Sequence, residues 1–238
     1  MNTYLFRNSI LLICIFLLFV SGCSKDSSPT GPNTPSVGDL FPLVQNHAYV
    51  FNGYMVDVQI NKISGTDHRE AMVVCPSKTI MGKSAHLIID SVYYSNGGLQ
   101  SLDTTYIAKE ADGTVSIMTN LDIFMPVLQP TAGIGNVYNI YTLDSTITYQ
   151  GNSYHQSINI TGVLNQKENV QVPAGSFSAY RFELIEKDST KIGTQLISAS
   201  EFRQTYWFAE NIGPVKIFQT SSSAGANNTV QELVNKNF

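Results

Sequence analysis

Apolar and polar residues alternate with a period of two along much of the chain. From Val137 to Tyr149 the odd positions are mostly apolar, and most of the residues between them are polar. Such alternation is typical of a β-strand with one face buried and the other in water. The pattern resumes from Tyr154 to Leu164 after Gly151-Asn152, residue types that favour tight turns. These two stretches therefore predict a hairpin of two long strands.

Further strands are predicted by the same alternation, separated by residues that favour turns. Asn96-Gly97-Gly98 and Ala111-Asp112-Gly113 supply two of the turns, because Asn, Asp and Gly tolerate the positive φ of tight hairpins. The other predicted strands are Ala48 to Ile60, Arg69 to Cys75, Ser84 to Tyr94, Leu99 to Lys109, Thr114 to Thr119, Tyr180 to Leu184, Arg203 to Phe208, Val215 to Gln219 and Val230 to Val234.

Little helix is expected, because no segment repeats apolar residues at helical spacing. Leu121 to Gln129 is expected to form one or two helical turns, which Pro126 and Pro130 would limit. About ten strands with short connections favour an all-β fold made of one large, strongly curved antiparallel sheet. We expect this sheet to be an open or partly closed barrel whose concave face collects the aromatic side chains.

The beginning of the chain has the three parts of a secretory signal. Arg7 supplies a charge, residues 10–20 are uncharged and apolar, and the small residues Ser21 and Gly22 precede Cys23. The apolar run is shorter than the roughly 20 residues that a membrane-spanning helix needs. We therefore predict that residues 1–22 are a signal peptide.

The four residues Val20-Ser21-Gly22-Cys23 resemble the bacterial lipobox, in which a peptidase cuts before a cysteine that carries a diacylglycerol. The resemblance implies that Cys23 is lipidated and that acyl chains such as palmitate anchor the mature protein in a membrane. An ordinary signal peptide followed by an incidental cysteine is the alternative. Ser24 replaces the aspartate that favours inner-membrane retention, so an outer-membrane lipoprotein is expected, on the periplasmic or the cell-surface side.

The segment that follows is too polar to fold by itself. Residues 24–38 are mostly Ser, Pro, Thr, Gly and Asn, and such a composition cannot bury enough apolar surface to offset the entropy of ordering. We predict that residues 23–38 comprise the lipidated cysteine and a disordered tether. Residues 39–238 are then one β domain, of a size that all-β domains often reach singly.

Charge and cysteine content exclude several classes of protein. The formal net charge is −4 and Lys and Arg form no cluster, so nucleic acid is not expected as a partner. If Cys14 leaves with the signal and Cys23 is lipidated, Cys75 is the only free thiol and no internal disulfide can form. The apolar run from Ala71 to Cys75 predicts a buried, structural cysteine.

Two segments resemble a paired signature of secreted and lipid-anchored bacterial proteins that are grouped with LolA- and LolB-like lipoprotein carriers. The first is Asn169 to Phe177 followed by Tyr180-Arg181-Phe182, and the second is Thr205 to Lys216. Leu40-Phe41-Pro42-Leu43 resembles the start of the same domain, although Gln45-Asn46-His47 replaces the usual Gly-Asn. The resemblance implies a curved β-sheet, whose better-known members hold acyl chains in an apolar concavity.

A catalytic constellation is not recognisable in the sequence. His47, His68, His86 and His155 are scattered, with no second ligand at metal-binding spacing. There is no Gly-x-Ser-x-Gly elbow and no loop that would bind a dinucleotide or a phosphate. We therefore expect no metal, no cofactor and no enzymatic activity.

Two hypotheses for function follow, and a hydrolase is a third that would need a cluster of Ser or Asp with His in a cleft. The first is a non-enzymatic, lipid-anchored envelope protein that binds an apolar or amphipathic ligand in the concave face of its sheet. The second is a cell-surface module that binds a glycan or an envelope protein and has a fully packed core. The candidate ligand-binding residues are Tyr180, Phe182, Tyr206 and Trp207.

Overall fold

The computed structural model describes residues 37–120, 122–223 and 228–238. The predicted signal peptide, Cys23 and all but the end of the predicted tether lie outside the described residues. Within them, the only elements are β-strands and a short 3₁₀ helix, η2 (Pro130–Ala132). The twelve strands are β1 (Ala48–Val56), β2 (His68–Ile80), β3 (Lys83–Tyr94), β4 (Leu99–Lys109), β5 (Val115–Met118), β6 (Phe124–Leu128), β7 (Val137–Tyr149), β8 (Asn152–Val172), β9 (Gly175–Ile192), β10 (Gln195–Ala209), β11 (Gly213–Ser221) and β12 (Asn228–Lys236).

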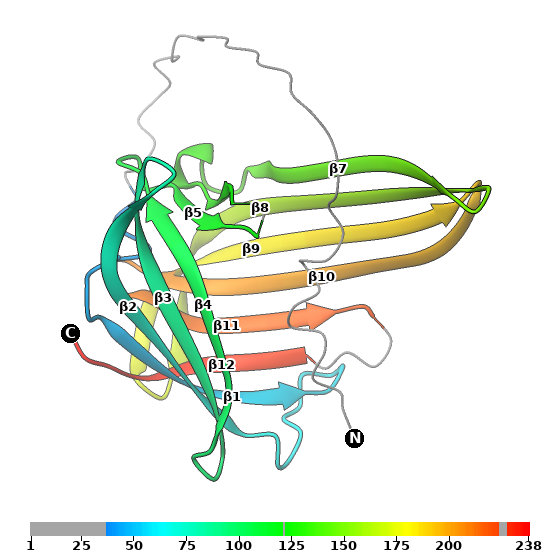
Figure 1. Cartoon of the computed structure of the whole chain (residues 1–238). Coiled ribbons are helices and arrows are strands. Elements are labelled where there is room, and N and C mark those ends of the chain that lie inside the picture. The colour runs from blue at the N-terminus through cyan, green and yellow to red at the C-terminus, as the bar shows by residue number, and fades with distance from the viewer. Residues whose placement is uncertain (1–36, 121, 224–227) are drawn as a thin grey trace. The chain divides into compact units, whose positions relative to one another are not determined.

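All twelve strands belong to one antiparallel sheet, with the order β6-β5-β4-β3-β2-β1-β12-β11-β10-β9-β8-β7 (Figure 1). Every pairing but one joins strands that are consecutive in the sequence. The exception is β1 with β12, where Tyr54 lies opposite Val230. This pairing joins the two runs of hairpins, so the first and last strands of the domain lie in the middle of the sheet.

The sheet curls until its two edges, β6 and β7, nearly meet, which makes an almost closed barrel. Tyr138 of β7 bridges the gap between them. Its hydroxyl donates a hydrogen bond to the Val127 carbonyl oxygen at 2.9 Å and accepts one from the Gln129 N–H at 3.0 Å. Gly162 on β8 leaves room for this ring, because a Cβ at that position would lie 2.7 Å from Tyr138 Cζ.

The hydrophobic core lies on the face of the sheet that is here called the inner face. Residues of β1 to β6 and of β8 to β12 contribute to one cluster, so the two halves of the curved sheet pack on each other. Burying each large apolar side chain contributes roughly 1.5–3 kcal/mol. The largest fully buried side chains are Tyr49, Phe51, Val74, Leu164, Val215 and Leu233.

The segment before β1 is attached to the end of this core. Phe41 packs edge-to-face on Phe208, with 6.1 Å between ring centroids. Lys109 Nζ lies 2.6 Å from the Asp39 carboxylate and donates a second hydrogen bond to the Phe41 carbonyl oxygen at 3.2 Å. Residues 40–43, which resemble the start of a domain, therefore include side chains that pack in or against the core.

The strands confirm the predicted all-β class and the single curved antiparallel sheet. Leu99–Lys109 and Val137–Tyr149 have the predicted bounds, and β7 and β8 form the predicted hairpin. The helical expectation for Leu121 to Gln129 is wrong, because Phe124–Leu128 forms β6. Pro126 is tolerated there because β6 is an edge strand and a missing N–H costs least at an edge.

Two long polar stretches of strand were not predicted. Strand β9 continues past Leu184 to Ile192, and β10 begins at Gln195. Their sequences in this part are rich in polar residues on both faces, so the period of two is weak. The prediction of a buried Cys75 is also wrong: β2 continues past it to Ile80 through a bulge, and the thiol is half-buried.

Candidate functional site

Three of the four candidate rings lie on the inner face. Phe182 is 2% exposed and Tyr180 is 9% exposed, both within the core cluster. Tyr206 is partly buried and stacks on Phe208, with 5.5 Å between ring centroids. The ring centroids of Phe182 and Tyr206 lie 6.2 Å apart. These rings fill space between the two halves of the sheet. Each pair of rings stabilises the fold by about 0.5–1.5 kcal/mol beyond the contribution of its buried area.

Trp207 lies on the opposite face, here called the outer face, because successive side chains of a strand alternate. Its neighbours in register are Arg181 on β9 and Lys216 on β11. The ring is half-buried, and the Lys216 ammonium lies 5.8 Å from its centroid. The indole N–H donates a hydrogen bond to the Glu168 carboxylate, which holds the ring in one orientation.

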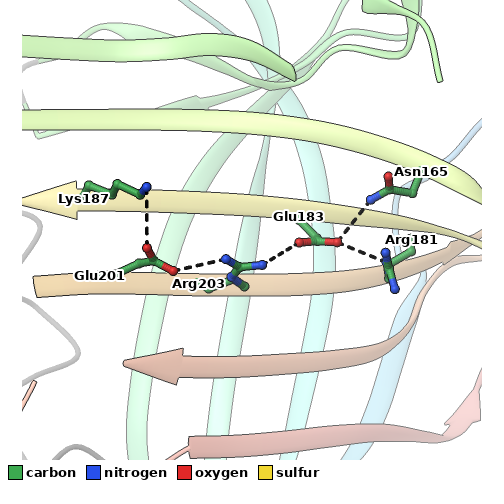
Figure 2. Close-up of polar contacts among 6 residues, drawn as sticks. All are labelled: Asn165, Arg181, Glu183, Lys187, Glu201 and Arg203. Carbon is green, nitrogen blue, oxygen red and sulfur yellow. Dashed lines mark hydrogen bonds and ion pairs between the residues drawn. The ribbon is translucent and has the colours of Figure 1, made fainter. Parts of the chain in front are cut away.

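Beyond Trp207, the outer face of β9 and β10 carries a row of ion pairs (Figure 2). The Arg203 guanidinium lies at 2.9 Å from the Glu183 carboxylate and at 3.1 Å from that of Glu201. Lys187 Nζ lies 3.8 Å from Glu201 at one end of the row, and Arg181 Nε lies 3.2 Å from Glu183 at the other.

Glu183 is the centre of the row. Its side chain is 15% exposed, whereas those of Arg181 and Arg203 are about 40% exposed. The Asn165 side-chain amide donates a further hydrogen bond to Glu183 at 3.2 Å. The carboxylate thus holds two partly exposed guanidinium groups in place. We name Arg181, Glu183, Lys187, Glu201, Arg203 and Trp207 the outer strip.

A shallow, open groove of about 400 Å³ lies at the Lys187 end of the outer strip. Eight of the nine residues that line it are polar or charged, and Ala199 is the apolar one. Such a lining suits a ligand rich in hydroxyls or charges better than an acyl chain. The groove is lined by Ser157, Asn159, Lys187, Asp188, Ser189, Ala199, Ser200, Glu201 and Ser222.

A second groove, of about 590 Å³, lies between β1, β2 and β3. His68, Arg69 and Tyr93 contribute to its wall. The Nδ1 of His68 lies 3.3 Å from the Thr66 carbonyl oxygen, and the ring covers Gly53, where a Cβ would come within 2.0 Å of Nε2. His68 therefore packs against β1, and it does not pair with a second histidine.

The remaining histidines are separate from one another in the fold. His47 stacks on Phe238 with 3.8 Å between centroids, and burial lowers its pKa. His86 Nδ1 lies 2.8 Å from the Cys75 carbonyl oxygen, and His155 Nε2 lies 3.5 Å from Asp144. Among the described residues no group of three His, Cys, Asp or Glu side chains is placed to hold a metal ion. Nor does any helix of the described residues have the length and apolarity to cross a membrane.

The sequence indicated Trp207 but not the groove or the row of ion pairs beside it. Glu183 and Arg203 are 20 positions apart, and they meet because Glu183 lies opposite Thr205 when β9 pairs with β10. In the sequence, alternating polar residues such as Ser157 and Asn159 have the pattern of any solvent-exposed strand face. Only the register of three strands shows which of them share a groove.

No protein-family model matches the chain, and no curated protein sequence matches it. Among solved structures, the fold resembles that of a predicted lipoprotein from Parabacteroides distasonis, with a TM-score of 0.52 and 13% identity. The match covers 84% of this chain and 99% of that one. The chain thus shares its fold with that protein.

Two further solved structures are similar at lower scores. One is an exported protein with YmcC-like fold from Bacteroides fragilis, with a TM-score of 0.45, 12% identity, and 85% and 100% of the two chains covered. The other is the hypothetical lipoprotein YmcC of Escherichia coli, with a TM-score of 0.31, 10% identity, and 81% and 85% covered. TM-scores below 0.5 do not establish a shared fold. The likeness to LolA- and LolB-like carriers stays a prediction.

Proposed function

We propose that this chain is a lipid-anchored protein of the bacterial outer membrane that acts by binding and not by catalysis. Cys23 would carry the acyl chains, and residues 24–38 would let the β domain stand away from the membrane surface. The lipobox resemblance supports the anchor, and so does the fold shared with a predicted lipoprotein.

The ligand that the geometry supports best is a glycan lying along the outer strip. The observation that carries this proposal is the place of Trp207, whose ring is half-buried on the outer face and held by Glu168. An aromatic ring offers a flat apolar face to the C–H groups of a sugar, while the flanking charged groups bind its hydroxyls. Glu201 and Trp207 are six positions apart on β10, so the outer strip is about 20 Å long at about 3.3 Å per residue.

The chain contains a single tryptophan, so its fluorescence reports on this site alone. We expect titration with a panel of soluble envelope oligosaccharides to change Trp207 fluorescence, and calorimetry to show weaker binding for Trp207→Ala and Arg203→Ala. Lys83→Ala is the matched control, because Lys83 also forms an exposed ion pair, with Glu110, but on β3. The proposal is wrong if no oligosaccharide binds, or if Trp207→Ala binds as the parent does.

An amphipathic ligand on the inner face is a second candidate. The inner face of β7 and β8 extends past the core, and its apolar side chains Leu143, Tyr154 and Ile158 are only half-buried there. Ile147, in the same rows, is 59% exposed. Native mass spectrometry and uptake of a fluorescent fatty acid test this candidate, and Leu143→Asn should lower that uptake. Fatty-acid uptake without oligosaccharide binding would favour it over the outer strip.

A further inference from the structure

Strand β7 forms one edge of the sheet and pairs only with β8 among the described strands. Figure 1 shows β7 as the outermost of the four long strands β7 to β10. Strand β6 approaches it near Tyr138, so the stretch from Thr142 to Tyr149 lies beyond that contact. Every second residue of an antiparallel edge strand directs its N–H and C=O away from the sheet. This part of β7 therefore presents a row of backbone groups that a further strand would match.

The two edges of the sheet differ in how they are protected. Edge strands are usually blocked by Pro, Lys, bulges or short length. Strand β6 has only five residues and contains Pro126. Strand β7 has 13 residues without Pro, Lys or Arg, and its one bulge lies before Tyr141. Ile147 and Tyr149 are 59% and 60% exposed on this strand.

The sequence around this part of β7 is almost the same in both directions. Tyr141 to Tyr149 reads Tyr-Thr-Leu-Asp-Ser-Thr-Ile-Thr-Tyr, with Ser145 in the middle. Reversal exchanges Tyr with Tyr, Thr with Thr, Leu with Ile, and Asp with Thr. Such symmetry has no use in pairing with β8, whose residues opposite Tyr141 and Tyr149 are Ile160 and Asn152. It is the property that pairing with an identical strand requires.

We infer that β7 pairs antiparallel with β7 of a second copy of this chain, about a two-fold axis at Ser145. In this register Leu143 lies opposite the partner's Ile147, and Thr142 lies opposite the partner's Thr148. The single charge, Asp144, meets the partner's Thr146, so no like charges face each other. The result is a dimer in which two sets of long strands continue as one sheet.

Cysteine cross-linking of the full chain in cell membranes tests both the partner and the register. In a Cys75→Ser background, Ser145→Cys should form a disulfide-linked dimer on mild oxidation. Opposite residues of antiparallel strands lie about 4.5–5.5 Å apart between Cα atoms, within the range that a disulfide spans. Asp144→Cys alone and Thr146→Cys alone should cross-link poorly, because each lies about 8 Å from its own copy, while the two together should cross-link well.

The controls separate this dimer from chance collision and from misfolding. The Cys75→Ser parent should give no dimer, and every variant should keep the parent's thermal melting temperature. In detergent, sedimentation should show a dimer for the parent and a monomer for Ile147→Lys, which places a charge opposite the partner's Leu143. Equal cross-linking of the three single-cysteine variants, a monomeric Ser145→Cys, or a Ser145→Cys adduct with a different protein would each overturn the inference.

Discussion

The Tyr49 hydroxyl lies where a side chain at residue 213 would begin, since a Cβ built on Gly213 would come within 2.7 Å of Tyr49 Oη. Gly213 also has a φ of +104°, a conformation that residues with a Cβ rarely adopt. Tyr49 is 1% exposed on β1, and burial raises the pKa of its hydroxyl. The turn between β10 and β11 can therefore lie this close to Tyr49 because residue 213 has no side chain.

We predict that Gly213→Ala lowers the free energy of unfolding by about 1–3 kcal/mol, because the backbone is strained and the Tyr49 hydroxyl must move. Gly151→Ala is the matched control: Gly151 has a φ of +77° but nothing within 4 Å of its Cβ position. Denaturant unfolding should show a smaller loss for Gly151→Ala. In a Tyr49→Phe background the Gly213→Ala loss should shrink, and an unchanged loss would show that the contact does not matter.

Phe182→Ala should lower the free energy of unfolding by about 3–5 kcal/mol, the usual cost of removing a packed aromatic ring. The ring is 2% exposed and contacts Tyr206 and Phe208. Leu102→Ala is the control, because Leu102 is 58% exposed, and it should change stability by less than about 0.5 kcal/mol. A small loss for Phe182→Ala would mean that the ring borders open space, and would favour an apolar ligand on the inner face.

Lys109→Met should release the segment before β1. The substitution keeps an apolar stem but removes the ion pair with Asp39 and the hydrogen bond to the Phe41 carbonyl oxygen. The two side chains are 26% and 35% exposed, so we expect a loss of about 1 kcal/mol. Hydrogen exchange should become faster at residues 38–41 than in the parent. Lys83→Met, which breaks the more exposed pair with Glu110, should leave exchange at 38–41 unchanged.

Glu186 should make the protein less stable as the pH rises above 4.5. Burial, and secondarily the nearby Asp188, raises the pKa of Glu186 above its ordinary value of 4.5. Between 4.5 and the raised pKa, the folded state holds a proton that the unfolded state has released, so stability falls as the pH rises through this window. Glu186→Gln removes this loss. Its advantage over the parent, measured by denaturant unfolding, should grow from pH 4.5 upward and then level off; parallel curves would contradict the prediction.

Glu210 should have the opposite effect, in a more acidic window. A hydrogen bond from Lys167, and then one from the Gly38 N–H, lowers the pKa of Glu210 below 4.5. The stabilisation is therefore complete above pH 4.5 and is lost as the pH falls through the lowered pKa. Glu210→Gln should be less stable than the parent at pH 7 and should approach it below pH 4. A constant difference down to pH 3 would show that the carboxylate is not involved.

Strands with one buried face were predictable from the sequence, and strands with two polar faces were not. Leu99–Lys109 and Val137–Tyr149 have the predicted bounds, and from Tyr141 to Ser145 the side chains of one face are half-buried while those of the other face are exposed. Between Leu184 and Arg203 neither face is strongly buried. There the backbone pairing of β9 with β10 maintains the strands, and a sequence pattern does not report it.

The sequence by itself determined the all-β class, the hairpins and the turns at Gly97, Gly113 and Gly151, because these depend on neighbours along the chain. Only the tertiary structure decided that β1 pairs with β12, which requires residues about 180 positions apart to meet. It also decided the roles of the adjacent rings Tyr206 and Trp207. Alternation places them on opposite faces, and both are partly buried against the core. Only the packed structure shows that the first stacks on Phe208, whereas the second contacts Glu168 and lies near Lys216.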